Sequence, residues 1–221
     1  MSRMMIISAA VAVIGLGAYF ATSTGSSVTP SDPLGAANAQ ETGDVDTSLI
    51  QDMTAGNPDA PVTVIEYASF TCPHCAAFHA GPYKQLKSDY IDTGKINFVY
   101  REVYFDRYGL WASMIARCAG PDRYFGMADL IYSGQSEWSR AGDPSAIVDE
   151  LRKIGRLAGL DNDTLEACLQ DADMARTLVA WYQENAEADS IDSTPSFVIN
   201  GKKYSNMSYS EMAQIIDDAS N

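Results

Sequence analysis

Positive charge is scarce in this sequence. Its 221 residues include 15 Lys and Arg against 29 Asp and Glu, so the formal net charge is −14 at pH 7. Phosphate groups are bound by clustered basic side chains, and this acidic balance therefore argues against nucleic acid as a partner. The apolar fraction of 46% and the charged fraction of 20% are those of a globular protein.

Cysteine and histidine are also few, at four and two residues. Four cysteines in a chain of this length are too few for a small domain held together by disulfides. A hydrophobic core must therefore drive folding, and the cysteines are available for chemistry or for local bracing. The sequence also lacks internal repeats, so we expect one domain and not an array.

The longest apolar run lies at the N-terminus, where residues 4–20 carry no charge and follow Arg3. Its length falls between the core of a cleaved signal and a full membrane span, so residues 1–22 are predicted to be a signal peptide or a membrane anchor. Residues 23–47 contain mostly small and polar residues, which predicts a disordered linker. Both interpretations of the N-terminus place the rest of the chain outside the cytoplasm.

Residues 48–220 are predicted to form the folded domain. A short edge strand is expected at 48–53, before a turn rich in Gly, Asn and Pro. The β-branched run at 62–67 is typical of a strand covered on both faces, and a helix follows from Pro73 with a kink at Gly81-Pro82. With a second strand at 96–100, this order predicts a parallel strand–helix–strand unit.

The second half of the domain combines helices with a hairpin. Apolar residues recur at three- or four-residue steps between about 106 and 191, which predicts a helical insertion. Its aromatic residues, including Trp111, Trp138 and Tyr182, are interpreted as core or interface and not as a cofactor site. Asn200-Gly201 between two strand-like runs predicts a hairpin, and an amphipathic helix is expected from about Ser208.

Two cysteines, Cys72 and Cys75, enclose Pro73 and His74 where the first long strand gives way to a helix. Disulfide exchange needs one sulfur with a stabilised anion, because the thiolate attacks and leaves. At a helix start, Cys72 would face free backbone N–H groups and the positive end of the helix dipole, and His74 can add a donor or a charge. We therefore predict that Cys72 is the exposed reactive sulfur with a lowered pKa, and that Cys75 is a more buried resolving partner.

A bracing disulfide or half of a zinc site is the alternative for this pair. The two-residue spacing closes too small a loop to constrain an unfolded chain much. Zinc would need two more ligands, and Cys118, Cys168 and His79 offer no second closely spaced pair. We favour a redox dithiol and interpret His79 as a helix-surface residue.

Cys118 and Cys168 both fall in the predicted helical insertion. An exported protein tends to oxidise such a pair, so a structural disulfide between them is expected. Two buried free thiols are the alternative.

The motif and the order of elements together resemble the DsbA-like group of exported bacterial proteins, which are thioredoxin-fold disulfide oxidoreductases. Three features carry the resemblance: Cys72-Pro73-His74-Cys75 after a strand, the helical insertion, and Thr194-Pro195 just before a strand. The resemblance implies an α/β thioredoxin fold, βαβ then ββα, with the insertion between the two halves.

The resemblance also implies roles for residues outside the motif. Thr194–Pro195 is expected to be cis, although trans is the commoner state of such bonds, and to present backbone beside the dithiol to an extended client. Glu66 matches an acidic position that the family buries near the active site, where a carboxylate could tune Cys75 or relay protons to it. A half-exposed strand glutamate is the alternative for Glu66.

The function implied by this resemblance is the introduction of disulfides into reduced exported proteins in the periplasm. The exchange would pass through a mixed disulfide at Cys72 and needs no cofactor. A membrane oxidase would reoxidise the dithiol, the N-terminus could tether the protein to the membrane, and a monomer is expected. The alternatives are an isomerase or reductase of the same fold and, from another class, a non-catalytic module that holds clients or a metal.

Overall fold

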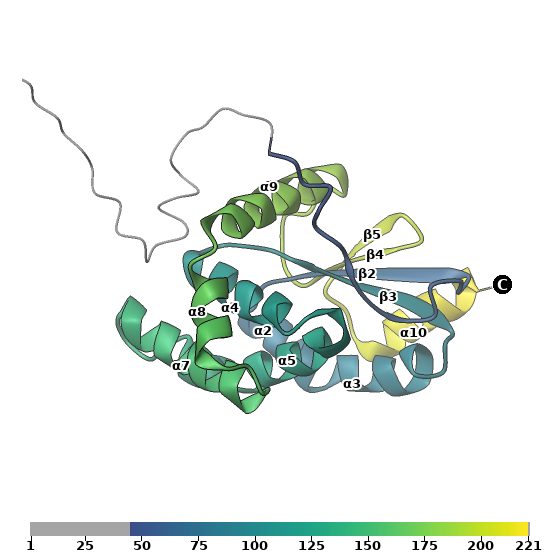
Figure 1. The fold of residues 1–221 in the computed structure, drawn as a ribbon. Helices are drawn as coiled ribbons and strands as arrows, with labels where there is room; N and C mark the ends of the chain where they lie inside the picture. The colour runs from purple at the N-terminus through teal and green to yellow at the C-terminus, as the bar shows by residue number, and fades with distance from the viewer. Residues whose placement is uncertain (1–44, 221) are drawn as a thin grey trace, which may run out of the picture.

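A computed structural model describes residues 45–220 of the protein (Figure 1). The signal peptide or anchor predicted at 1–22 and the linker up to residue 44 lie outside the described residues. Within the described part, no helix is both long enough and apolar enough to cross a membrane.

Five strands form one sheet in the order β1-β3-β2-β4-β5. The parallel pair at its centre is β2 (Val62–Ala68) with β3 (Ile96–Glu102). β1 (Met53–Gly56) runs antiparallel to β3, and β4 (Ser196–Ile199) runs antiparallel to β2 and β5 (Lys202–Ser205). The predicted thioredoxin arrangement of βαβ followed by ββα is therefore confirmed, with β1 added at one edge.

Helices fill the connections between the strands. Between β2 and β3 lie α2 (Pro73–Ala80), α3 (Pro82–Leu86) and the π-helix η1 (Lys87–Ile91). The predicted helical insertion consists of α4 (Arg107–Cys118), α5 (Pro121–Ser133), α6 (Gln135–Trp138), α7 (Pro144–Leu157), α8 (Asn162–Leu169) and α9 (Ala172–Ala188). α10 (Tyr209–Ala219) closes the fold, and the Ser208 hydroxyl caps its start by accepting from the Glu211 N–H.

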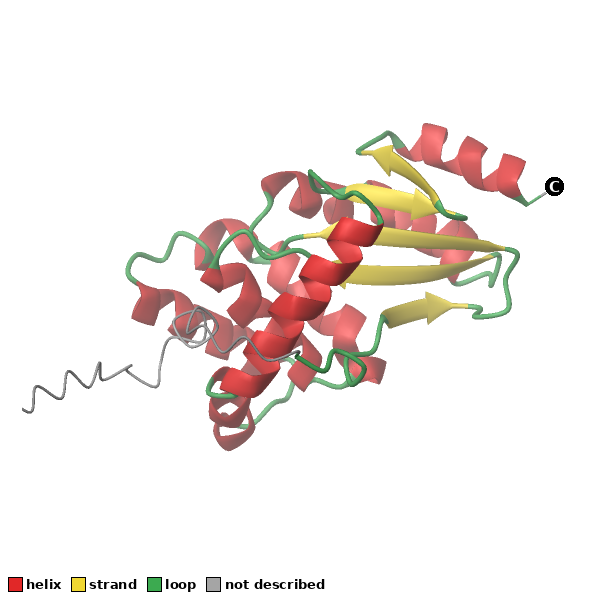
Figure 2. Ribbon diagram, turned by 90° about the horizontal axis from the view of Figure 1, so that it is seen from above, coloured by secondary structure: helices red, strands yellow, loops and turns green. Residues whose placement is uncertain are grey.

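The helices lie on both faces of the sheet. Figures 1 and 2 show α9 crossing one face, while α2, α3 and α5 lie on the other. Side chains of β2 alternate accordingly: Val62, Val64 and Glu66 belong to the α2 side, whereas Tyr67 donates to the Asn185 carbonyl on α9. This alternation places Glu66 beneath the helix that carries the dithiol.

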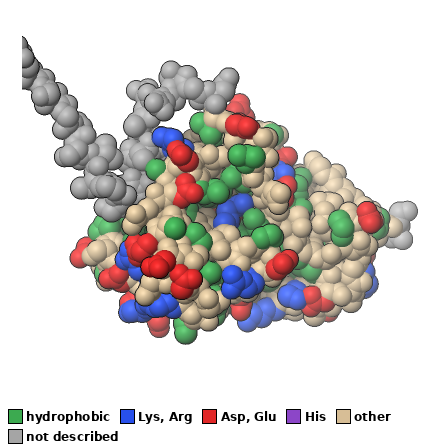
Figure 3. Space-filling view, in the orientation of Figure 1, with side chains coloured by type: hydrophobic (Ala, Val, Ile, Leu, Met, Phe, Trp, Pro, Cys, Tyr) green, Lys and Arg blue, Asp and Glu red, His purple; other side chains and the backbone are tan. Residues whose placement is uncertain are grey.

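Acidic side chains gather over the α7–α8 end of the face shown in Figure 3, with Lys and Arg among them. Several of these charges are paired. Arg152 forms ion pairs with Asp149 and Glu166, and Lys153 pairs with Glu150. The net negative charge of the chain is thus partly offset locally at this end.

One local prediction was confirmed and two were wrong. The hairpin turn at Asn200-Gly201 has positive φ at both residues, 45° and 80°, as a two-residue type I′ turn requires. The expected edge strand at 48–53 instead begins at Met53, where the backbone pairs with Tyr100 of β3. The predicted kink is a break, because Gly81 leaves the helical region at φ −133° and ψ −81° before Pro82 starts α3.

Candidate active site

The Cys72-Pro73-His74-Cys75 motif lies where β2 gives way to α2. Cys72 is the residue that precedes the first turn of α2, and Pro73 takes the first helical position, where its missing N–H has no helical partner to lose. The Cys72 N–H donates to the Ser69 carbonyl at 3.0 Å, which tightens the turn out of the strand. This geometry aims the free N–H groups of the first helical turn at the Cys72 sulfur.

The two cysteines differ in exposure. Cys72 is 9% exposed and Cys75 is fully buried, and both carry free thiols in the structure. Cys72 is less exposed than the sequence predicted, because its Sγ lies against the loop before β4 and donates to the Thr194 carbonyl at 3.5 Å. The asymmetry between an outer and an inner sulfur is nevertheless present.

The electrostatics of the pair are also asymmetric. A hydrogen bond from the Cys75 thiol lowers the pKa of Cys72 most, and the Thr194 side chain and the backbone N–H groups of Cys75 and His74 add to this effect against the cost of burial. Together they lower the pKa of Cys72 from 9.0 to about 5. Burial, followed by the thiol of Cys72 and the charge of Glu66, raises the pKa of Cys75 far above its ordinary value. Cys72 is therefore the sulfur that holds a negative charge.

His74 contributes to this site differently from the sequence interpretation. Its backbone N–H is among the donors that lower the pKa of Cys72, whereas its side chain is exposed, as is Pro73. The first turn of the helix thus stabilises the anion through a main-chain N–H, which any residue other than proline at position 74 would supply.

The loop before β4 completes the outer face of the site. The Thr194–Pro195 peptide bond is cis, as the resemblance implied. Thr194 is half-buried and contacts Cys72 through its carbonyl, although Pro195 itself is buried. Residues 122 positions apart in the chain therefore lie side by side at the reactive sulfur.

Glu66 is fully buried beneath α2 and has a partner that the sequence interpretation placed on the surface. Nε2 of His79 lies 3.1 Å from both carboxylate oxygens of Glu66. His79 is 3% exposed, so its assignment as a helix-surface residue was wrong. The spacing of four residues from Cys75 to His79 was the available signal, because residues one turn apart share a helix face.

A further contact to the motif comes from α6 and has no signal in the sequence. The side-chain amide of buried Gln135 donates to the Phe70 carbonyl at 2.7 Å and to the Cys72 carbonyl at 2.9 Å. These two carbonyls flank the turn that leads into α2. The helical insertion is thereby connected directly to the backbone of the reactive cysteine.

Cys118 at the end of α4 and Cys168 in α8 form the expected disulfide. It joins two helices of the insertion, and neither cysteine is among the groups that act on Cys72 or Cys75. This position agrees with a bracing role.

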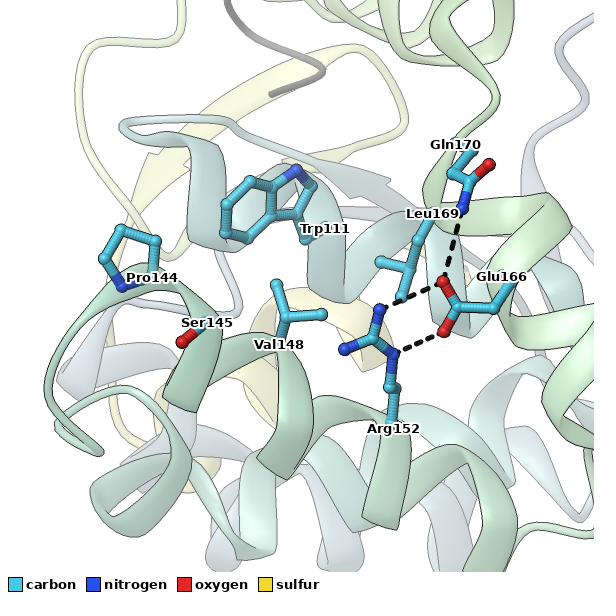
Figure 4. Close-up of a pocket in the computed structure, with 8 residues that line it drawn as sticks. All are labelled: Trp111, Pro144, Ser145, Val148, Arg152, Glu166, Leu169 and Gln170. Atoms are coloured by element: carbon cyan, nitrogen blue, oxygen red, sulfur yellow. Dashed lines mark hydrogen bonds and ion pairs between the residues drawn. The ribbon is translucent and has the colours of Figure 1, made fainter. Parts of the chain in front are cut away.

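A cavity of about 290 Å³ lies elsewhere in the insertion, between α4, α7 and α8 (Figure 4). Trp111 and Val148 form its apolar walls, and the bidentate ion pair of Arg152 with Glu166 closes one side. None of the proposed site residues lines it. Between residues 45 and 220, no group of three or more His, Cys, Asp or Glu side chains could hold a metal ion.

Comparison with known proteins identifies the family of the chain. The family described as Thioredoxin matches residues 48–218. A provisionally named protein-disulfide oxidoreductase of Rickettsia bellii is 37% identical over 169 residues, which are 76% of this chain and 64% of the relative. The alignment thus spans less than two thirds of the length of that relative.

Solved structures show the same fold. Alpha-DsbA1 of Wolbachia pipientis has a TM-score of 0.71 at 27% identity, with 78% of this chain and 92% of that chain covered. A protein-disulfide isomerase from Novosphingobium aromaticivorans has a TM-score of 0.68 at 25% identity, with 78% and 100% covered. The chain therefore belongs to the thioredoxin family, and it is similar in sequence and fold to DsbA-like protein-disulfide oxidoreductases.

Proposed function

We propose that this protein is a periplasmic oxidase that introduces disulfides into reduced exported proteins. A client thiolate attacks Sγ of Cys72 in the oxidised pair, a bond forms between client and Cys72, and the bond to Cys75 breaks. A second client thiolate then attacks the client sulfur of this mixed disulfide, which releases the oxidised client and the Cys72 thiolate. Two electrons pass from the client to the Cys72–Cys75 pair.

The position of Cys72 at the start of α2, where the first helical turn offers hydrogen-bond donors to its sulfur, is the observation that carries this proposal. A low pKa favours the reduced, charged form of the pair, and a disulfide whose reduced form is stabilised is a stronger oxidant. The four donors that lower the pKa of Cys72 outweigh its burial and leave it at about 5. The low pKa of Cys72 therefore supports oxidation of clients over their reduction.

The remaining parts of the proposal concern partners and place. The Thr194 carbonyl lies beside Sγ of Cys72, and we propose that an extended client segment pairs with the backbone there. Reoxidation is assigned to a membrane oxidase, and residues 1–22 are proposed to export the protein or to tether it to the membrane. We propose that the protein acts as a monomer.

The decisive experiment mixes the purified oxidised domain with a reduced, unfolded client that contains two cysteines. We expect stoichiometric transfer of one disulfide to the client, read by thiol alkylation and mass spectrometry. Cys72→Ser should abolish transfer, while the double variant Cys118→Ala/Cys168→Ala should retain it. Full activity in Cys72→Ser would instead identify a module that holds clients without catalysis.

The in-cell redox state separates the oxidase from an isomerase, the function that the name of the Novosphingobium relative favours. Acid trapping followed by alkylation of Cys72 and Cys75 should find the pair mostly oxidised. A mostly reduced pair would contradict the oxidase and support an isomerase or a reductase. Fractionation of the same cells, with mass measurement of the mature chain, tests the periplasmic location and the cleavage of residues 1–22.

A further inference from the structure

Cys75 cannot remain charged when it leaves the disulfide. Its sulfur is fully buried, and burial disfavours the thiolate. The electron pair of the broken S–S bond stays on Sγ of Cys75, so this atom needs a proton as the mixed disulfide forms. The solvent on the Cys72 side does not reach it.

A buried pair of titratable groups lies next to Cys75. His79 follows Cys75 by one turn of α2, so both side chains face the sheet below, where Glu66 projects from β2. Nε2 of His79 contacts both oxygens of Glu66 at 3.1 Å, and both side chains are at most 3% exposed. Glu66 and His79 therefore lie on the same side of α2 as Cys75.

Aromatic rings hold the imidazole of His79 in place. Tyr132 stacks on it with ring centroids 4.2 Å apart and an angle of 18° between the planes, and Tyr83 lies with its centroid at 4.5 Å. With Nε2 fixed on Glu66, the second ring nitrogen, Nδ1, points away from the carboxylate. The ring is therefore oriented to accept a proton on one side and donate one on the other.

A small cavity connects this ring to the outside. It has a volume of about 60 Å³, which is room for a few water molecules. It lies between α2, α3 and α5, and it is lined by Ala76, His79, Ala80, Lys84, Asp129, Tyr132 and Ser133. Lys84 and Asp129 are exposed, whereas neither Glu66 nor Cys75 lines the cavity, so His79 separates them from it.

We propose that His79 is the outer member of a proton relay that runs from this cavity through Glu66 to Sγ of Cys75. The proposal rests on the exchange reaction proposed above. As the Cys72–Cys75 bond breaks, Sγ of Cys75 takes a proton from Glu66. Glu66 regains one from Nε2 of His79, and Nδ1 takes one from solvent in the cavity. When Cys75 attacks during reoxidation, the thiol of Cys75 returns a proton to Glu66, and one proton leaves through His79 to the cavity.

The charged and titratable groups around His79 come from every element packed against it. They are Glu66 on β2, Tyr100 on β3, Cys75 on α2, Tyr83 and Lys84 on α3, and Asp129 and Tyr132 on α5. Burial raises the pKa of each of the three tyrosines, so none of them ionises in the range where imidazole titrates. The relay is therefore assigned to the imidazole of His79 and the carboxyl group of Glu66, and not to the tyrosines.

The test measures reduction of the Cys72–Cys75 bond by excess dithiothreitol in a single turnover, across the pH range in which imidazole titrates. His79→Gln removes the imidazole, and we expect the rate to fall about tenfold to a hundredfold. The rate should also lose its dependence on pH in that range. The pKa of Cys72, read from the ultraviolet absorption of its thiolate, should stay unchanged. Lys87→Gln, at an exposed ion pair with Asp92 beyond α3, is the matched control and should keep the original rate.

A double variant distinguishes a relay from two separate structural effects. Because His79 acts through Glu66, Glu66→Gln/His79→Gln should be no slower than Glu66→Gln alone. This pair of neutral amides also avoids an unpaired buried carboxylate if His79→Gln folds poorly. Added imidazole should restore the rate of His79→Ala in proportion to its concentration.

The proposal is overturned if His79→Gln retains the original rate and pH profile. It is equally overturned if the losses in the two single variants multiply in the double variant. Because dithiothreitol takes the place of the client, these outcomes do not depend on whether the protein oxidises clients in the cell.

Discussion

Replacing Cys75 by Ala in the reduced protein should raise the pKa of Cys72, and replacing it by Ser should raise it less. The hydrogen bond from the Cys75 thiol is the largest of the influences that lower the pKa of Cys72. Alanine removes this donor, whereas the serine hydroxyl can still donate to the thiolate. The two variants are similar in size, so they differ mainly in this one interaction.

The magnitude follows from the strength of hydrogen bonds to charged groups. Such a bond contributes about 1.5–3 kcal/mol, and one pKa unit corresponds to about 1.36 kcal/mol. Cys72 still touches solvent, which screens part of the interaction, so the lower end of the range applies. We therefore expect Cys75→Ala to raise the pKa of Cys72 by roughly 1 unit above its value of about 5, while Cys75→Ser raises it by less than half of that.

The assay is titration of the Cys72 thiolate by its ultraviolet absorption, repeated as the pH dependence of alkylation by iodoacetamide. Both variants leave Cys72 as the titrating thiol of the motif, and the Cys118–Cys168 disulfide does not react. Equal pKa values in the Ala variant, the Ser variant and the unsubstituted protein would refute the reasoning. The stabilisation would then belong to the backbone N–H groups of the first helical turn and to Thr194.

Three further outcomes are expected. The first concerns pH, because the pKa of Cys72 is lowered from 9.0 to about 5. In urea unfolding, the reduced protein should gain stability relative to a Cys72→Ser variant as the pH rises from about 5 to about 9. It should lose that gain as the pH falls through 5. Removing the Cys118–Cys168 disulfide, which closes a loop of 50 residues, should lower the free energy of unfolding by about 4 kcal/mol in the same assay. Thiol exchange should continue in that variant. Arg117→Met should lower the free energy of unfolding by about 3–5 kcal/mol, because the carboxylate of Glu102, which is 1% exposed, loses its bidentate partner. A smaller loss in Arg117→Met/Glu102→Leu would show that the unpaired charge of Glu102 causes it.

Local sequence signals predicted the elements whose conformation depends on neighbouring residues. The β-branched run at 62–67 forms β2, and Asn200-Gly201 forms the turn whose positive φ values those two residues favour. The start of α2 was predictable because proline fits a first helical turn. In each case the preference of a few residues agrees with the final fold.

Features set by tertiary contacts were not predictable in the same way. β1 is a strand because Met53 and the next residues pair with β3, and its own sequence ends in Gly56 with φ of +92°. Burial of His79 depends on Glu66 lying below α2, and the contact of Gln135 with the motif depends on how α6 packs. The candidate site was therefore visible as a motif, while the groups that support it from below and from the side appear only once the chain is folded.

The two cysteines differ as leaving groups, so the two steps of disulfide exchange have different requirements. An attacking thiolate can reach Cys72 but not Cys75, so attack on Cys72 must expel Cys75, whose buried anion is the poorer leaving group. The second step has the opposite character, because it expels Cys72, whose anion is stabilised. Protonation of Cys75 is thus the demanding event of the first step, and the stability of Cys72 favours the second. The start of α2 stabilises the anion of Cys72, and the buried carboxyl group of Glu66 is the group that we propose protonates Cys75.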